Sequence, residues 1–188
     1  FDIRIWSLIS HDARFYLFKE AYVRTSSEEY DLSGEKLDQV YVHLTNNAVQ
    51  KYSKNYGKFE EGNIVSVKAL AQELASQDQF ASSLSADQIE TALYKQMREQ
   101  IQLSYEAVRS KLRFSKHSFE LVGYDFMVVP VVNGSDSSTQ CEFKTKLIEA
   151  NTNPCLEESN QLLKDLIPRM LDDMLKIVLD PLFGTTLA

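Results

Sequence analysis

The sequence has few cysteines and no long apolar run. Its 188 residues contain two cysteines, Cys141 and Cys155, too few for a disulfide framework, so we expect both to stay reduced in an intracellular setting. No apolar stretch approaches the ~20 residues that a membrane span needs, and we find no signal peptide, internal repeat or low-complexity tract. These absences predict a cytoplasmic protein with no membrane partner.

Positive charge is also in short supply. The chain has 20 basic and 27 acidic residues, a formal net charge of −7, which argues against a general nucleic-acid binder. Its length suits one domain that buries roughly 70% of the surface of its unfolded chain. The chain opens on Phe1, in a stretch that reads like the middle of a strand. We therefore expect residues 1–188 to be one domain cut from a longer protein.

Residues 119–151 carry the clearest structural pattern. Two apolar arms, rich in β-branched and aromatic residues, flank a polar run that begins Asn133-Gly-Ser and is typical of a turn. If Asp125 lies opposite Glu149, the turn centres on residues 136–138, which fall inside that polar run. We predict a β-hairpin with this register.

The hairpin arms also carry polar side chains where a core strand would not. Residues two apart share one face of a strand, so Glu149 and Asn151 are expected to project together beside Asp125. Two carboxylates and an amide oxygen form a hard, oxygen-only site suited to Mg²⁺ and the phosphates it carries. The alternative is that all three residues are solvated on an outward face of the sheet.

An arginine interrupts the first predicted strand. Residues 1–9 and 14–19 read as a hairpin, and residues 21–27 carry Arg24 into a Thr-Ser-Ser segment. A guanidinium cannot lose its proton, so Arg4 either pairs with a carboxylate or faces a ligand phosphate, unless it lies on the surface.

Residues 46–58 contain no acidic residue. Three lysines, Lys51, Lys54 and Lys58, alternate there with Tyr52 and Tyr56, which gives an acidic chain one local positive stretch. Such a segment suits an anionic partner, although a solvated loop has the same composition.

Three helices are predicted from capping and periodicity. Ser66 begins a short helix, and Ser85-Ala-Asp-Gln88 forms a capping box for a helix that ends near Lys111. The second helix has an apolar stripe of Ile89, Leu93, Met97, Ile101, Tyr105, Val108 and Leu112. Residues 156–179 predict a third helix with a break or kink near Ile167, because Pro168 follows.

The order of these elements sets the fold class. Strands come first, then helices, then the hairpin and a last helix, with no alternation of parallel strands and helices. This order predicts an α+β fold with a mostly antiparallel sheet packed with helices.

Six short stretches together resemble one family. They are Phe1-Asp-Ile-Arg4, Val23-Arg-Thr-Ser-Ser-Glu28, His43-Leu-Thr-Asn46, Lys51-Tyr-Ser-Lys-Asn-Tyr-Gly-Lys58, Phe119-Glu-Leu-Val-Gly-Tyr-Asp-Phe126 and Leu147-Ile-Glu-Ala-Asn151. In this order, across almost the whole chain, they are similar to the tubulin tyrosine ligase family. The resemblance implies the C-terminal part of an ATP-grasp fold. It also implies an ATP-dependent ligase that joins an amino acid to a carboxylate on tubulin.

The resemblance also implies roles for individual residues. Asp125, Glu149 and Asn151 would hold Mg²⁺, with Asn46, Asp125 and Glu149 beside the nucleotide. Arg4 would be the catalytic arginine that reaches the transferring phosphoryl group. The implied cofactors are ATP and Mg²⁺, and the implied partners are a tubulin C-terminal tail and a free amino acid, at the cytoskeleton or the cilium.

Recognition of a glutamate-rich tail by an acidic chain requires local positive charge. Lys51 and Lys54 lie in the stretch that lacks acids, and their attraction would act over roughly one Debye length, ~8 Å at physiological salt. Arg24 is a further candidate, because a guanidinium can bind a carboxylate in bidentate fashion.

Several alternatives stay open. Residues 51–62 favour tyrosine as the added amino acid and residues 151–157 disfavour it, which leaves tyrosine, glutamate and glycine. The family's nucleotide-gripping lysines would precede Phe1, so we expect the 188 residues alone to be inactive. A non-catalytic tubulin-binding fragment and an ATP-grasp ligase with another acceptor remain alternatives. A protein kinase is excluded, because no glycine follows Asp125-Phe126 and no His-Arg-Asp loop exists.

Overall fold

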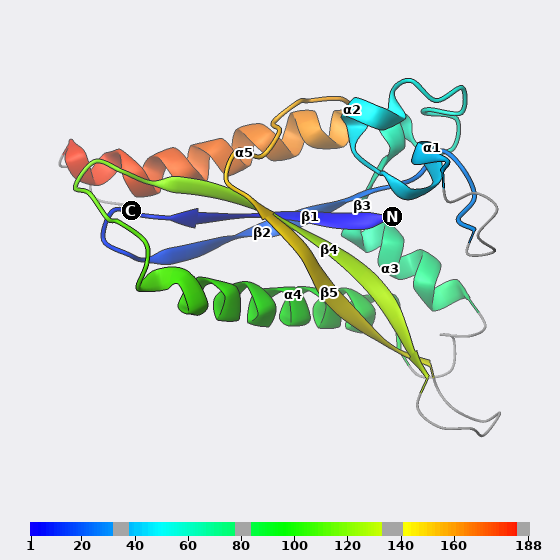
Figure 1. Ribbon diagram of the computed structural model, residues 1–188, viewed down its shortest axis with the longest axis horizontal. Coiled ribbons are helices and arrows are strands. Elements are labelled where there is room, and N and C mark those ends of the chain that lie inside the picture. Colours follow the sequence, from blue (N-terminus) through cyan, green and yellow to red (C-terminus); the bar gives the residue numbers. More distant parts are fainter. Residues whose placement is uncertain (32–37, 78–83, 133–140, 184–188) are drawn as a thin grey trace.

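The first strand of the chain is the middle strand of its sheet (Figure 1). A computed structural model describes residues 1–31, 38–77, 84–132 and 141–183. Within them, five antiparallel strands lie in the order β3-β2-β1-β4-β5. Their bounds are β1 Asp2–Ile9, β2 Phe15–Arg24, β3 Ile64–Ser66, β4 Glu120–Val132 and β5 Cys141–Asn151. The predicted α+β class with an antiparallel sheet is confirmed.

Helices cover both faces of this sheet. In Figure 1, α4 and α5 run on opposite sides of β1 and β2, and the short helices gather at the end where β1 begins. The α-helices are α1 Val40–His43, α2 Asn47–Gln50, α3 Val67–Ser76, α4 Ala86–Arg109 and α5 Gln161–Val178. Two 3₁₀ turns, η1 Glu61–Asn63 and η2 Asp180–Leu182, complete the described elements.

Because β1 is the central strand, its side chains pack into two separate hydrophobic cores, one on each face of the sheet. Ile3 and Ile5 are fully buried among residues of α3 and α4, whereas Trp6 is fully buried among residues of α5. Every residue of β1 is buried. The period of two along the strand therefore divides its side chains between the two helical layers.

The predicted register of the hairpin is confirmed where its polar residues lie. Asp125 is opposite Glu149, and Gly123 is opposite Asn151. Beyond Asp125 the pairing shifts by one residue, because Phe126 pairs with Leu147 and Ile148 is left over, so partner numbers do not sum to one constant along the whole hairpin. The predicted turn, residues 136–138, lies outside the described residues.

The second strand is longer than predicted. We expected a strand-like run at residues 14–19, and β2 continues from there to Arg24. Its pairing with β1 is irregular between Ile5 and Ser7, where β2 contains extra residues. A bulge keeps the strand continuous while it changes which side chains share a face.

The predicted helix caps are confirmed. Ser66 accepts a hydrogen bond from the Ala69 amide at the start of α3, and Ser85 and Gln88 form a capping box at the start of α4. Five members of the predicted apolar stripe of α4 are buried, namely Ile89, Leu93, Met97, Ile101 and Tyr105. The prediction was wrong for Val108, which is exposed near the end of the helix.

The last helix starts later than predicted. We placed it at residues 156–179, but α5 begins at Gln161, where the side chain of Asn160 accepts a hydrogen bond from the Leu163 amide. Residues 152–160 cross the sheet before the helix can start. The expected break at Pro168 was also wrong, because α5 continues through it as one helix.

Among the described residues, no helix is both long and apolar enough to span a membrane.

Candidate functional site

The three central strands bring the predicted polar residues to one face of the sheet. Arg4 on β1 lies opposite Asp125 on β4, and Asp125 lies opposite Glu149 on β5. On the other side of β1, Asp2 lies opposite Arg24 on β2. Residues that pair directly share a face, and so do residues two apart on one strand. All five side chains therefore belong to the face that α5 covers.

Four of these side chains form a buried ionic network. Arg4 binds Asp125 in bidentate fashion, through Nε and through Nη2 at 2.7 Å from Oδ2. Arg24 donates from Nε to both oxygens of Asp2, at 3.0 and 3.1 Å, and its Nη2 lies 2.9 Å from Asp125 Oδ2. None of the four residues is more than 8% exposed. Asp125 therefore joins two guanidinium groups that are both shielded from water.

Charge pairing dominates the protonation of this network. Burial would raise the pKa of Asp125, but the hydrogen bond from Arg4 and the charge of Arg24 outweigh it, so the pKa lies below its usual value. Burial would lower the pKa of Arg24, yet its bond to Asp2 and the charge of Asp125 hold the pKa above the usual value. Both groups are therefore charged at neutral pH.

Glu149 and Asn151 extend this network toward solvent. The Asn151 amide donates to Glu149 Oε1 at 2.8 Å and lies 3.4 Å from Asp125 Oδ2. Glu149 is exposed and Asn151 is half-buried, in contrast to the buried Asp125. The structure thus brings Asp125, Glu149 and Asn151 together, with one buried carboxylate and one that water or a ligand can reach.

The donor set fits a magnesium ion that keeps part of its hydration shell. Magnesium sites commonly use one or two carboxylates and leave the remaining positions to water and phosphate oxygens. Glu149 and Asn151 offer such oxygens on the solvent side, while both oxygens of Asp125 already accept bonds from Arg4. In the described part of the chain, no group of three or more His, Cys, Asp or Glu residues could hold a metal ion by itself.

A glycine makes this packing feasible. A Cβ on Gly123 would lie 2.8 Å from Pro154 Cβ and 3.1 Å from Arg4 Cδ, closer than real side chains approach. Gly123 thus lets the segment after β5 cross directly over Arg4. The absent side chain helps to seal the ionic network from water.

Asn46 lies next to a residue that binds the same network. Thr45 donates from Oγ1 to Asp2 Oδ1, which ties the loop between α1 and α2 to the start of β1. Asn46 is exposed, and its carbonyl accepts the amides of Val49 and Gln50 at the start of α2. Its side chain is therefore at the surface, one residue from the network.

Two members of the network carry no role in the sequence prediction. Asp2 was noted only as a neighbour of Arg4, and Thr45 was not singled out at all. Asp2 has a sequence signal, because it stands two residues before Arg4 and must share its face of the strand. Thr45 has no comparable signal, since its contact depends on where the loop lies in space.

The predicted lysines form a separate, exposed group. Lys51 and Lys54 lie in a run of turns after α2, and both are exposed. Lys51 lies over the ring of Tyr52, with Nζ 5.5 Å from the ring centroid. Arg24 does not belong to this group. It is buried and paired with the carboxylates of Asp2 and Asp125, whereas the sequence analysis named it as a candidate to bind a carboxylate of the partner.

Comparison with known proteins gives one consistent result. A family model described as "Tubulin-tyrosine ligase family" matches residues 1–186. "Tubulin glycylase 3B" of Tetrahymena thermophila is 29% identical over 186 residues. "Probable alpha-tubulin polyglutamylase Ttll1" of the same organism is 25% identical over 181 residues, and human "Inactive polyglycylase TTLL10" is 29% identical over 181 residues.

The match covers nearly all of this chain but a limited part of each relative. It spans 96%, 95% and 96% of the chain, and 14%, 39% and 25% of the glycylase, the polyglutamylase and the inactive polyglycylase. The residues matched by the family model, 1–186, include the whole ionic network together with Glu149 and Asn151. With its family model matched over residues 1–186, the chain belongs to the tubulin-tyrosine ligase family.

Proposed function

We propose that the protein is an ATP-dependent carboxylate–amine ligase that adds an amino acid to tubulin. One observation carries the proposal: the solvent-accessible Glu149 and Asn151 adjoin the buried network of Asp125, Arg4 and Arg24 on one face of the sheet. The names of the relatives, which refer to tubulin glycylases and polyglutamylases, support the same reaction class. The fold would be the C-terminal part of an ATP-grasp catalytic domain.

The chemistry explains why such a site suits ligation. A carboxylate is a poor electrophile, so ATP would first convert it to an acyl phosphate, and an amine would then displace the phosphate. The protein needs no covalent nucleophile for this reaction, and rate comes from positioning and from stabilising charge. Bound Mg²⁺ would supply neutralisation of the phosphate oxygens.

The residues divide these tasks according to their exposure. Glu149 and Asn151 would hold Mg²⁺ on the solvent side, and Asp125 would supply a further oxygen ligand from the buried side. Arg4, fixed by two hydrogen bonds to Asp125, would direct its positive charge at the transferring phosphoryl group. Asn46, at the exposed end of its loop, would lie beside the nucleotide.

A ligation assay tests this assignment. With the protein as its gene encodes it, tubulin, ATP and Mg²⁺, the added mass would be measured by mass spectrometry for tyrosine, glutamate and glycine in turn. We expect one of the three to be incorporated, and Glu149→Gln to lower kcat/KM roughly a hundred-fold. Glu99→Gln, an exposed carboxylate on α4, is the matched control and should keep the wild-type rate. Full turnover by Glu149→Gln at ordinary Mg²⁺ would exclude this metal site.

We further propose that the exposed lysines attract the acidic tail of tubulin, with the protein acting in the cytoplasm, at the cytoskeleton or in cilia. Charge reversal at Lys51 and Lys54 should raise the apparent KM for tubulin and leave the affinity for ATP unchanged. The dependence of KM on salt should also weaken, because the attraction is screened over about 8 Å at physiological salt. An unchanged KM with the same salt dependence would mean that this segment is only solvated surface.

A non-catalytic tubulin-binding protein is the second candidate. The observation in its favour is a relative that is named inactive and has the same 29% identity to this chain as the glycylase. Binding of tubulin in a co-sedimentation assay, without incorporation of any of the three amino acids, would favour this candidate over the ligase.

A further inference from the structure

The outward backbone groups of β5 and of β2 differ in how far the rest of the chain covers them. At the β5 edge, side chains of α4 bind the backbone of the strand. Gln96 Oε1 accepts the Thr145 amide at 2.8 Å, and Gln100 binds both the Thr145 carbonyl, at 3.0 Å, and the Leu147 amide, at 3.1 Å. Such contacts satisfy the outward backbone groups and prevent pairing with another strand.

The β2 edge has this protection only at one end. β3 pairs with Tyr22, Val23 and Arg24, and the next outward amide, that of Ala21, donates to the hydroxyl of Tyr94 at 3.0 Å. Along the rest of β2, Phe15, Tyr16 and Leu17 pair with β1, residues 18–20 lie in the irregular stretch between the two paired parts, and the described part of the chain places no strand on the outward side. The outward backbone groups of this stretch therefore lack a strand to pair with.

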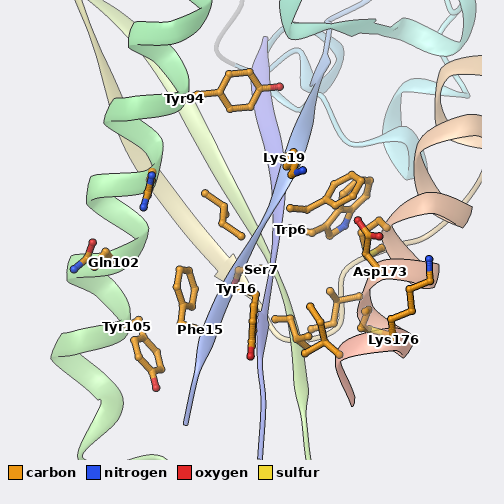
Figure 2. A pocket seen from close by; sticks show the side chains of 18 of the residues that line it. Trp6, Ser7, Phe15, Tyr16, Lys19, Tyr94, Gln102, Tyr105, Asp173 and Lys176 are labelled. Carbon is orange, nitrogen blue, oxygen red and sulfur yellow. The ribbon is translucent and has the colours of Figure 1, made fainter. Parts of the chain in front are cut away.

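This open edge forms the floor of a groove. Figure 2 shows β2 running between α4 on one side and α5 on the other, with Tyr105 and Gln102 on the first wall and Asp173 and Lys176 on the second. The groove has a volume of about 1090 Å³. Since strands pair about 4.8 Å apart and rise about 3.3 Å per residue, residues 15–17, which keep regular pairing with β1, offer a template roughly 10 Å long. Residues of both α4 and α5 line the two sides of the groove.

The floor of the groove is apolar and partly exposed. Phe15, Tyr16, Leu17 and Phe18 follow one another along β2, and all four are half-buried. Exposed apolar edge strands promote aggregation, and proteins normally cover them with charge, proline or another segment. Residues 15–18 have neither charge nor proline, so this part of the edge is left for another segment to cover, whereas the charged Lys19 and Glu20 follow it.

The α4 wall of the groove is positively charged. Five basic and two acidic residues line it, whereas the whole chain has a net charge of −7. Lys95, Arg98 and Arg109 are exposed along one wall, and within the described residues none of them forms an ion pair. A basic wall above an apolar floor complements an acidic chain that also carries apolar side chains.

We propose that the groove binds an acidic polypeptide partner in extended conformation, which pairs with β2 along residues 15–17. Its backbone would complete the sheet, its alternate apolar side chains would cover the floor, and its carboxylates would face Lys95 and Arg98. Strand addition of this kind takes its affinity from the backbone and its specificity from alternate side chains. The proposal is independent of the ligase site, which lies at the other end of β2.

Labelled synthetic peptides test the proposal on the protein as its gene encodes it. The probe is a ten-residue peptide of alternating glutamate and valine, titrated by fluorescence anisotropy. Matched controls replace glutamate with lysine, or the two central valines with proline, which cannot pair as a strand. Amide hydrogen exchange, read by mass spectrometry, locates the bound peptide.

We expect the acidic peptide alone to bind, and at about 90% occupancy to slow exchange over residues 15–17 about ten-fold. Charge reversal at Lys95 and Arg98 should weaken binding roughly ten-fold. Reversal at Lys144 and Lys146, exposed on β5 and outside the groove, should change it less than two-fold.

Three outcomes would overturn the proposal. Equal binding of the acidic and proline-containing peptides would exclude strand pairing. Loss of binding on reversal of Lys51 and Lys54, but not of Lys95 and Arg98, would place the peptide on the lysine segment. Protection of residues 15–17 that rises with protein concentration alone, together with dimers in sedimentation, would identify a second copy of the chain as the occupant.

Discussion

Replacing Asp125 with asparagine should destabilise the protein strongly. The substitution keeps the size of the side chain but removes the charge that binds two buried guanidinium groups. Arg24 would retain Asp2 as its partner, whereas Arg4 would lose both hydrogen bonds to a carboxylate. Arg4 is 4% exposed, so water cannot replace the lost partner without local opening of the fold.

The size of the effect follows from the burial of the pair. Removing one partner of a buried ion pair typically costs about 3–5 kcal/mol, because the remaining charge is left uncompensated. For a chain of this length, each kcal/mol shifts Tm by about 2–4 °C. We therefore expect Asp125→Asn to lower Tm by roughly 6–20 °C. The Asp125→Asn variant should therefore lose stability as well as activity.

Urea denaturation at pH 7, followed by circular dichroism, measures this difference. Glu149→Gln is the matched control, because it removes a charge from the neighbouring residue across the same hairpin, but at an exposed position. Surface substitutions usually change the free energy of unfolding by less than about 0.5 kcal/mol. A loss below about 1 kcal/mol for Asp125→Asn would refute the view that this network supports the fold.

Two further predictions concern the same network. Gly123→Ala should lower the free energy of unfolding by about 1–3 kcal/mol, because the new Cβ would clash with Pro154 and Arg4; unchanged urea midpoints would contradict this. Stability should also fall in acid. The pKa of Asp125 is lowered in the fold, so its contribution is complete above its unfolded-state pKa of about 3.9 and is lost as the pH falls below that value. Denaturation from pH 6 to pH 2 should show this loss in the wild type, and Asp125→Asn should lack that part of it.

Local sequence signals predicted those parts of the fold that depend on short-range chemistry. The capping box at Ser85 and the apolar stripe of α4 follow from spacing along one helix, and both are present. The opposition of Asp125 and Glu149 follows from two strands joined by a short polar run, and it is present too. Each of these features needs only residues close in the sequence or a single turn between them.

The wrong predictions have tertiary causes. Arg24 was expected to bind a carboxylate of the partner, but its carboxylate partner in the fold is Asp2, which is set by the pairing of β1 with β2. The start of α5 was misplaced because Pro154 packs against Gly123, a contact that no periodicity reveals. Val108 fits the apolar stripe, yet it is exposed in the fold. For Arg24 and the start of α5, the deciding contact joins residues that are distant in sequence.

The division between buried and exposed residues bears on how the candidate site would work. Arg4, Asp125, Arg24 and Asp2 lie on paired strands and bind one another, so their positions are fixed before any ligand arrives. Preorganised charges of this kind need no rearrangement when charge develops on a substrate, whereas water molecules would have to reorient. Glu149, Asn151 and Asn46 are more accessible, and the last of these stands on a loop tied to Asp2 through Thr45. A ligand would therefore contact the accessible groups of Glu149, Asn151 and Asn46 first. The buried charged network beneath them is fixed by the paired strands of the sheet.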